Sequence, residues 1–171
     1  MEKIIIGGVI CYGIGNFLYQ WIQKQKLRQQ HIDAFLVFLQ KSLYAMETGK
    51  IRLISYFQEY QSSDTVLMKI LKEISNRLSE NQYPYGELLW EEVFQEYREQ
   101  WKCNEEVFLL IVNASHGFFG KSRQENICFL QKSIRELEIQ QRKEKEKDAQ
   151  EQKVWLPVGI LGSLMFFIIL I

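Results

Sequence analysis

Each end of the chain carries a long segment without a charged residue. Residues 4–22 are 19 residues without Asp, Glu, Lys or Arg, and residues 154–171 are 18 such residues. A helix rises about 1.5 Å per residue, so about 20 uncharged residues cross a hydrocarbon core about 30 Å thick. Only a helix satisfies the backbone groups of a single segment in lipid. The sequence therefore predicts an N-terminal transmembrane helix over 4–22 and a C-terminal one over 154–171.

Each segment has an alternative interpretation. A cleaved signal peptide is disfavoured for the first, because bulky Phe17, Tyr19 and Trp21 stand where a cleavage site needs small residues. A buried core helix is disfavoured for the last, because a small domain has few ways to cover a helix that is apolar on every face.

The positions of the basic residues predict how the chain crosses the membrane. Lys3 alone precedes the first segment, whereas bases gather on the inner side of both segments, at residues 24, 26, 28, 143, 145, 147 and 153. Loops rich in Lys and Arg stay in the cytosol. We therefore expect a two-helix cell-membrane protein with residues 23–153 in the cytosol and both termini outside.

Between the two segments, the apolar spacing predicts helices throughout. Apolar residues recur three and four positions apart and never alternate cleanly. The expected helices cover 23–47, 51–60, 65–80, 87–101 and 104–115, a turn with Pro84 covers 81–86, and a sixth helix follows Ser122. Candidate N-caps are Asn104 and one of Ser62, Ser63 and Asp64. The predicted fold class is all-α: a cytosolic bundle of about six helices over 23–139, then a charged helical extension over 140–153 expected to be a solvated rod.

The charge balance disfavours nucleic acid as a partner. The chain has 21 basic and 21 acidic residues, and only Glu2 and Lys3 lie outside residues 23–153. The middle of the chain is therefore neutral in its own right. A neutral segment has no excess charge for phosphates or for broad binding to an anionic bilayer.

No catalytic, cofactor or metal site is predicted. His116 lies 13 residues after Cys103 and 12 before Cys128, which matches no known ligand spacing, and no CxxC pair is present. A phosphate-binding GxxxxGK[ST] loop is also absent. An enzyme is therefore disfavoured.

The start of the sixth helix carries a short motif. Ser122 and Glu125 have the spacing of a capping box. The stretch Phe119-Gly120-Lys121-Ser122-Arg123-Gln124-Glu125-Asn126 resembles the Leu-Gly-x-Ser-Asp-x-Glu-Asn stretch of the stage III sporulation protein AB family. Gly120, Ser122, Glu125 and Asn126 match it, and Arg123 departs from the family's Asp. The last helix, from Lys153 onward, is also similar, whereas the family's Pro-rich turn after Gly49 is missing.

This resemblance implies a fold similar to the cytosolic helical domains of type II secretion F-type platform proteins. It implies a non-enzymatic subunit of the channel between mother cell and forespore, with its bundle in the mother-cell cytosol. Implied partners are other channel subunits, a secretion-type ATPase and the lipid bilayer, and self-association stays open. Gly120, Ser122, Glu125 and Asn126 either contact a partner or only shape the turn. The competing hypotheses are a membrane-tethered signalling or regulatory adaptor unrelated to sporulation and a membrane enzyme.

Overall fold

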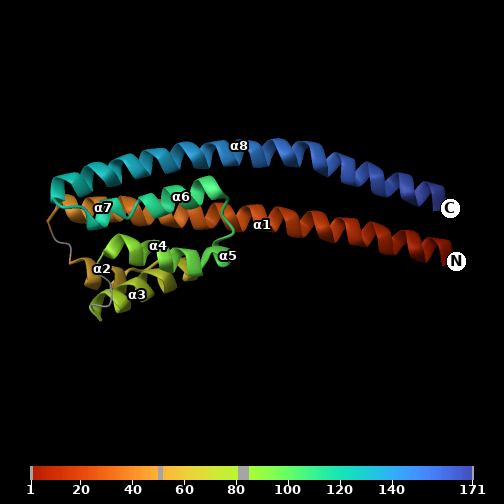
Figure 1. The fold of residues 1–171 in the computed structure, drawn as a ribbon. Coiled ribbons are helices and arrows are strands. Elements are labelled where there is room, and N and C mark those ends of the chain that lie inside the picture. The colour runs from red at the N-terminus through yellow and green to blue at the C-terminus, as the bar shows by residue number, and fades with distance from the viewer. Residues whose placement is uncertain (1, 50–51, 81–84, 171) are drawn as a thin grey trace. The chain divides into compact units, whose positions relative to one another are not determined.

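The computed structural model describes residues 2–49, 52–80 and 85–170, and nearly all of them are helical (Figure 1). The helices are α1 (Glu2–Glu47), α2 (Leu53–Glu59), α3 (Thr65–Ser79), α4 (Gly86–Glu96), α5 (Arg98–Trp101), α6 (Glu105–Asn113), α7 (His116–Phe119) and α8 (Arg123–Leu170). These ranges contain no strand, so the predicted all-α class is confirmed.

The sequence predicts one helix over 87–101, but the structure has two helices there, so this prediction is wrong. Tyr97 has φ −93° and ψ 3°, so α4 ends before it and the single turn α5 starts after it. The second single turn, α7, was also not separated by the sequence pattern. Residue 51 of the helix predicted over 51–60 and residues 81–84 of the predicted turn lie outside the described residues.

The chain forms two compact units. Residues 1–27 and 143–171 make up the paired-helix unit, and residues 28–142 make up the bundle unit. Helices α1 and α8 contribute to both, so the predicted boundaries after residues 22, 139 and 153 fall inside continuous helices. Among the described residues, no helix offers a stretch that is both long and apolar enough to count as a membrane span.

Aromatic rings form the centre of the bundle unit. Phe35 and Phe38 from α1 lie 6.3 and 6.4 Å from Trp90 of α4, measured between ring centroids. The Trp90 indole N–H donates to the Ile111 carbonyl at 3.0 Å and ties α4 to α6. Further buried rings complete this core: Phe57, Phe94, Trp101 and Phe118. Large aromatic side chains bury the most apolar area per residue, so these rings dominate the packing.

Of the three candidates Ser62, Ser63 and Asp64, Asp64 is the N-cap of α3, and it also binds a histidine. Its Oδ1 accepts hydrogen bonds from the backbone N–H groups of Val66 and Leu67 at 2.9 and 3.1 Å, and its Oδ2 lies 2.5 Å from His31 Nδ1. Burial would raise the pKa of the Asp64 carboxyl, but the hydrogen bonds from His31 and the backbone outweigh it and lower this pKa. The His31 ring stacks on Trp101, so one cap connects α1, α3 and α5.

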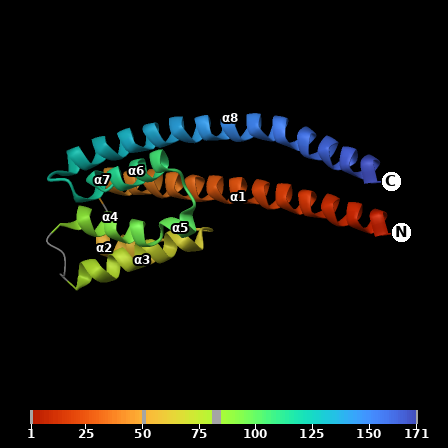
Figure 2. The ribbon, with the colours of Figure 1, turned by 45° about the vertical axis from the view of Figure 1, so that its right-hand side comes forward.

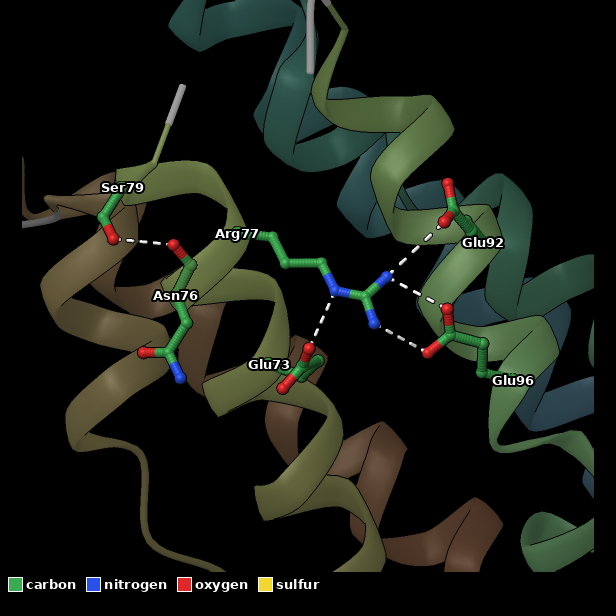
Figure 3. Close-up of polar contacts among 6 residues, drawn as sticks. All are labelled: Glu73, Asn76, Arg77, Ser79, Glu92 and Glu96. Carbon is green, nitrogen blue, oxygen red and sulfur yellow. Dashed lines mark hydrogen bonds and ion pairs between the residues drawn. The ribbon is translucent and has the colours of Figure 1, made fainter. Parts of the chain in front are cut away.

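Arg77 joins α3 to α4 through a cluster of carboxylates (Figure 3). Its Nε donates to Glu73 at 2.7 Å, and its two terminal nitrogens donate to Glu96 at 3.0 and 2.8 Å. Glu92 lies further away, at 3.5 Å. Two views show α2, α3 and α4 side by side in this unit (Figures 1 and 2).

In the paired-helix unit, α1 and α8 lie side by side with both chain ends at the same end of the pair (Figures 1 and 2). Gln25 hydrogen-bonds to Gln152 at 2.8 Å and to Glu151 at 3.4 Å. A Cβ on Gly159 would lie 2.6 Å from Leu18, so the missing side chain permits this close approach.

The charged extension over 140–153 is helical, but it is not solvated on all sides. Gln141, Glu144 and Asp148 are buried, with the two carboxylate residues only 5% and 7% exposed. Their spacing continues the steps of three and four that begin with Leu130 and Leu137. One face of α8 therefore stays buried beyond Leu137, the last apolar residue of this spacing. The expectation that residues 140–153 form a solvated rod is wrong for that face.

Candidate functional site

The four motif residues lie together at the start of α8. The Ser122 hydroxyl accepts a hydrogen bond from the Glu125 backbone N–H at 3.2 Å, which is the first half of the predicted capping box. The Glu125 side chain is exposed and makes no hydrogen bond among the described residues. The Asn126 amide donates to the Phe118 carbonyl at 3.5 Å and connects α8 back to α7.

Gly120 makes room for Asn126. Its φ of −67° suits any residue, so the requirement for glycine is spatial. A Cβ at this position would lie 2.2 Å from Asn126 Oδ1 and 3.0 Å from the His116 carbonyl oxygen. Three of the four motif residues, Gly120, Ser122 and Asn126, thus shape the turn between α7 and α8. Direct contact of the motif with a partner stays a prediction.

Arg123 stands where the stretch that this motif resembles has Asp, and it closes the site against α1. Its guanidinium donates to the Glu47 carbonyl at 2.7 Å, at the C-terminal end of α1. It also lies against Gly49, where a Cβ would be 3.4 Å from Nη1. Gly49 has φ +73°, a left-handed conformation that glycine adopts without strain.

These helix ends surround a surface cleft of about 320 Å³. Its lining comprises Met46, Gly49, Leu53, Phe118, Gly120, Lys121, Ser122, Arg123 and Asn126. The apolar side chains come from α1, α2 and α7, and the polar ones come from the turn and the first residues of α8. The sequence identified Gly120, Ser122 and Asn126 but missed the apolar lining, because it joins positions more than 60 residues apart.

His116, Cys103 and Cys128, the candidate metal ligands, do not form a metal site among the described residues. His116 Nδ1 lies 2.9 Å from Glu87, and its ring packs beside Phe129. Burial raises the pKa of the Cys103 thiol to about 11, so this sulfur is protonated at neutral pH. Across the described ranges, no three His, Cys, Asp or Glu residues are grouped as metal ligands would be.

Fold and site define an all-α protein with a helical bundle, a pair of long helices and a cleft built from helix ends. The family model of stage III sporulation protein AB matches residues 3–171, so the chain belongs to that family and is a sporulation-related protein. No curated protein and no solved structure matches the chain.

Proposed function

We propose that this protein is a non-enzymatic membrane subunit of the channel between mother cell and forespore, and that its bundle docks a secretion-type ATPase. Family membership supports a role in sporulation. The observation that carries the docking role is the cleft, which places apolar side chains beside an exposed base at the motif turn.

The proposed partner inserts an apolar side chain that has a carboxylate beside it. Met46, Leu53 and Phe118 offer the apolar part of the cleft. Lys121 is exposed at its rim and makes no ion pair among the described residues, so its ammonium group is available to a partner carboxylate. A buried apolar anchor flanked by a charge pair is a common way to combine affinity with orientation.

The membrane part of the proposal rests on the charge-free segments and on exposed apolar side chains in the paired-helix unit. Tyr12 and Ile168 are 76% and 73% exposed. Others on these two helices are also exposed: Val9, Phe17, Tyr19, Val154, Trp155, Val158, Ile160, Leu161, Leu164 and Met165. So much exposed apolar surface is rare in soluble monomers, and lipid chains would cover it. The two chain ends lie at the same end of the helix pair, which supports placing both termini on one side of the membrane.

Membership in a sporulation family disfavours the adaptor unrelated to sporulation. The membrane-enzyme hypothesis requires polar groups that converge in a pocket. Three of the four polar side chains of the cleft, Ser122, Arg123 and Asn126, instead bond to backbone groups of the turn and of α1.

Affinity capture of the full chain from sporulating cells tests the docking role. Lys121→Glu should reduce recovery of a secretion-type ATPase by at least about fivefold, because it sets like charges opposite each other. Lys69→Glu is the matched control, since Lys69 is exposed on α3 away from the cleft, and it should leave recovery unchanged. Recovery of no secretion components with the wild-type chain, or equal recovery with both variants, would contradict the proposal.

Ser122→Ala separates the two interpretations of the motif. Loss of the cap should cost about 1 kcal/mol of stability and lower the melting temperature. Loss of ATPase binding at an unchanged melting temperature would instead assign Ser122 to the interface.

Cysteine labelling in intact cells tests the orientation. Cys128 is a better reporter than half-buried Cys103, because its side chain is exposed. A membrane-impermeant maleimide should label Cys128 only after permeabilisation, and labelling from outside would overturn the cytosolic placement of the bundle.

A further inference from the structure

Burial separates the charges of the paired-helix unit by sign. Among the side chains described in this unit, the lysines at 24, 26, 143, 145, 147 and 153 are all exposed. Of its carboxylates, Glu144 and Asp148 are buried, Glu151 is partly buried, and Glu146 is exposed. The solvent-facing surface of this unit is therefore basic, although the sequence of the extension is nearly balanced in charge.

Three of these lysines lie at the edge of the apolar surface. The hydrogen bond between Gln25 and Gln152 sets these two residues at one level along the helix pair. Lys24 and Lys26 flank Gln25, and Lys153 follows Gln152, so all three occupy that level. The uncharged segments begin directly beyond them, at residue 22 of α1 and at Val154 of α8, and Val154 is 60% exposed. We call Lys24, Lys26 and Lys153 the boundary lysines.

We propose that the boundary lysines bind the headgroups of anionic lipids. This inference rests on the proposed insertion of the paired helices into a bilayer. If the apolar side chains beyond residue 153 lie among lipid chains, the ammonium groups at the boundary lie at headgroup depth. Each lysine near an anionic surface strengthens binding about fivefold.

The boundary lysines and anionic headgroups have opposite charges, but this match is local. The zero net charge of the whole chain therefore does not reveal it. Opposite charges separated by more than a Debye length, about 10 Å at 0.1 M salt, hardly compensate each other. The zero net charge of the whole chain therefore does not give the local charge at the boundary lysines.

Quenching of Trp155 by brominated lipids tests the proposal. Trp155 is 55% exposed and lies two residues after Lys153. The full chain is reconstituted into vesicles of phosphatidylcholine that contain a minor fraction of phosphatidylglycerol. In one set of vesicles part of the phosphatidylcholine carries bromine near its headgroup, and in the other set the phosphatidylglycerol does. The brominated lipid has the same mole fraction in both sets. The difference between wild type and Trp155→Phe isolates the signal of this residue. The brominated anionic lipid should quench Trp155 at least about twice as strongly as the brominated zwitterionic lipid. This difference between the two lipids should become smaller at about 1 M salt.

The triple variant Lys24→Gln, Lys26→Gln and Lys153→Gln should make the two lipids quench equally. The matched control removes three exposed lysines of the bundle unit, with Lys69, Lys72 and Lys132 replaced by Gln, and should keep the excess.

Equal quenching by both lipids in the wild-type chain would overturn this proposal and leave membrane insertion standing. If neither lipid quenched Trp155, insertion itself would fail, and the membrane part of the proposed function with it. If the triple variant still showed stronger quenching by the anionic lipid, the boundary lysines would not be its cause. The same would follow if the control variant also lost this difference. Equal quenching together with capture of single-stranded RNA through these lysines would assign them to nucleic acid instead.

Discussion

Replacing Asp64 should destabilise the bundle more than the loss of an ordinary helix cap. Asp64→Ala removes two hydrogen bonds to the N-terminus of α3 and the bond from His31 Nδ1. Loss of an N-cap costs about 1 kcal/mol. A buried donor left without a partner costs about 1–3 kcal/mol more, and the side chains of His31 and Asp64 are each only 6% exposed. The free energy of unfolding should therefore fall by about 2–4 kcal/mol.

Asn104→Ala is the matched control. Asn104 caps α6 by accepting a hydrogen bond from the Val107 N–H at 2.9 Å. Its loss should cost about 1 kcal/mol. A deficit for Asp64→Ala beyond this value is expected from the bond to His31, and a double-mutant cycle with His31→Ala measures that coupling directly.

The pH dependence distinguishes the charge of Asp64 from its geometry. Because the folded-state pKa of Asp64 is lowered, its ionised form stabilises the fold. This contribution is complete above the unfolded-state pKa, about 3.9, and is lost as the pH falls through the lower folded-state pKa. Asp64→Asn keeps the shape without the charge, so its deficit relative to wild type should be largest at neutral pH and should shrink below pH about 4.

Denaturant unfolding of the full chain in detergent provides the assay, followed by tryptophan fluorescence because Trp101 stacks on His31. A deficit for Asp64→Ala no larger than that of Asn104→Ala would refute the role of the histidine. A deficit for Asp64→Asn that stays constant in acid would refute the role of the charge.

Three further predictions concern packing, ion pairing and thiol reactivity. Gly120→Ala should destabilise the chain by about 1–3 kcal/mol in thermal unfolding, because its Cβ meets Asn126 Oδ1, and adding Asn126→Ala should restore part of the loss. Arg77→Met should cost about 1 kcal/mol at low salt and less at high salt in denaturant titrations, because partly exposed carboxylates surround its guanidinium. At pH 8, peptide mass spectrometry after brief alkylation should find Cys128 modified well before Cys103, whose thiol pKa of about 11 keeps it protonated.

The helices and their starts were predictable because their signals are local. Asn104 caps the helix that the sequence assigns to it, and Asp64 caps α3 as one of three candidates, since a side-chain oxygen at the N-cap needs only the next three residues. The break at Tyr97 has no such signal. No Gly or Pro marks it, and the apolar spacing of Val93 and Trp101 fits one continuous helix equally well.

The long-range features were not predictable, because apolar periodicity does not reveal polar residues at buried positions. Gln141, Glu144 and Asp148 continue the covered face of α8, yet their side chains are typical of a solvated helix. His31 likewise lies in a polar stretch of sequence, and its carboxylate partner is 33 residues away. The cleft also remained hidden, because its apolar lining comes from three separate helices.

Arg123 shows how a departure from a family motif can leave the turn intact. As the first residue of α8, it sets a positive charge at the positive end of that helix, where an Asp would be favoured. Its guanidinium instead reaches the Glu47 carbonyl at the negative end of α1. Each helix-end interaction is worth about 0.3–1 kcal/mol, so the gain at α1 offsets the loss at α8. The electrostatic character of the cleft changes more than its stability, because Arg123 joins Lys121 in the lining where an Asp would have opposed it. An acidic partner segment should therefore bind this chain more tightly than its Arg123→Asp variant.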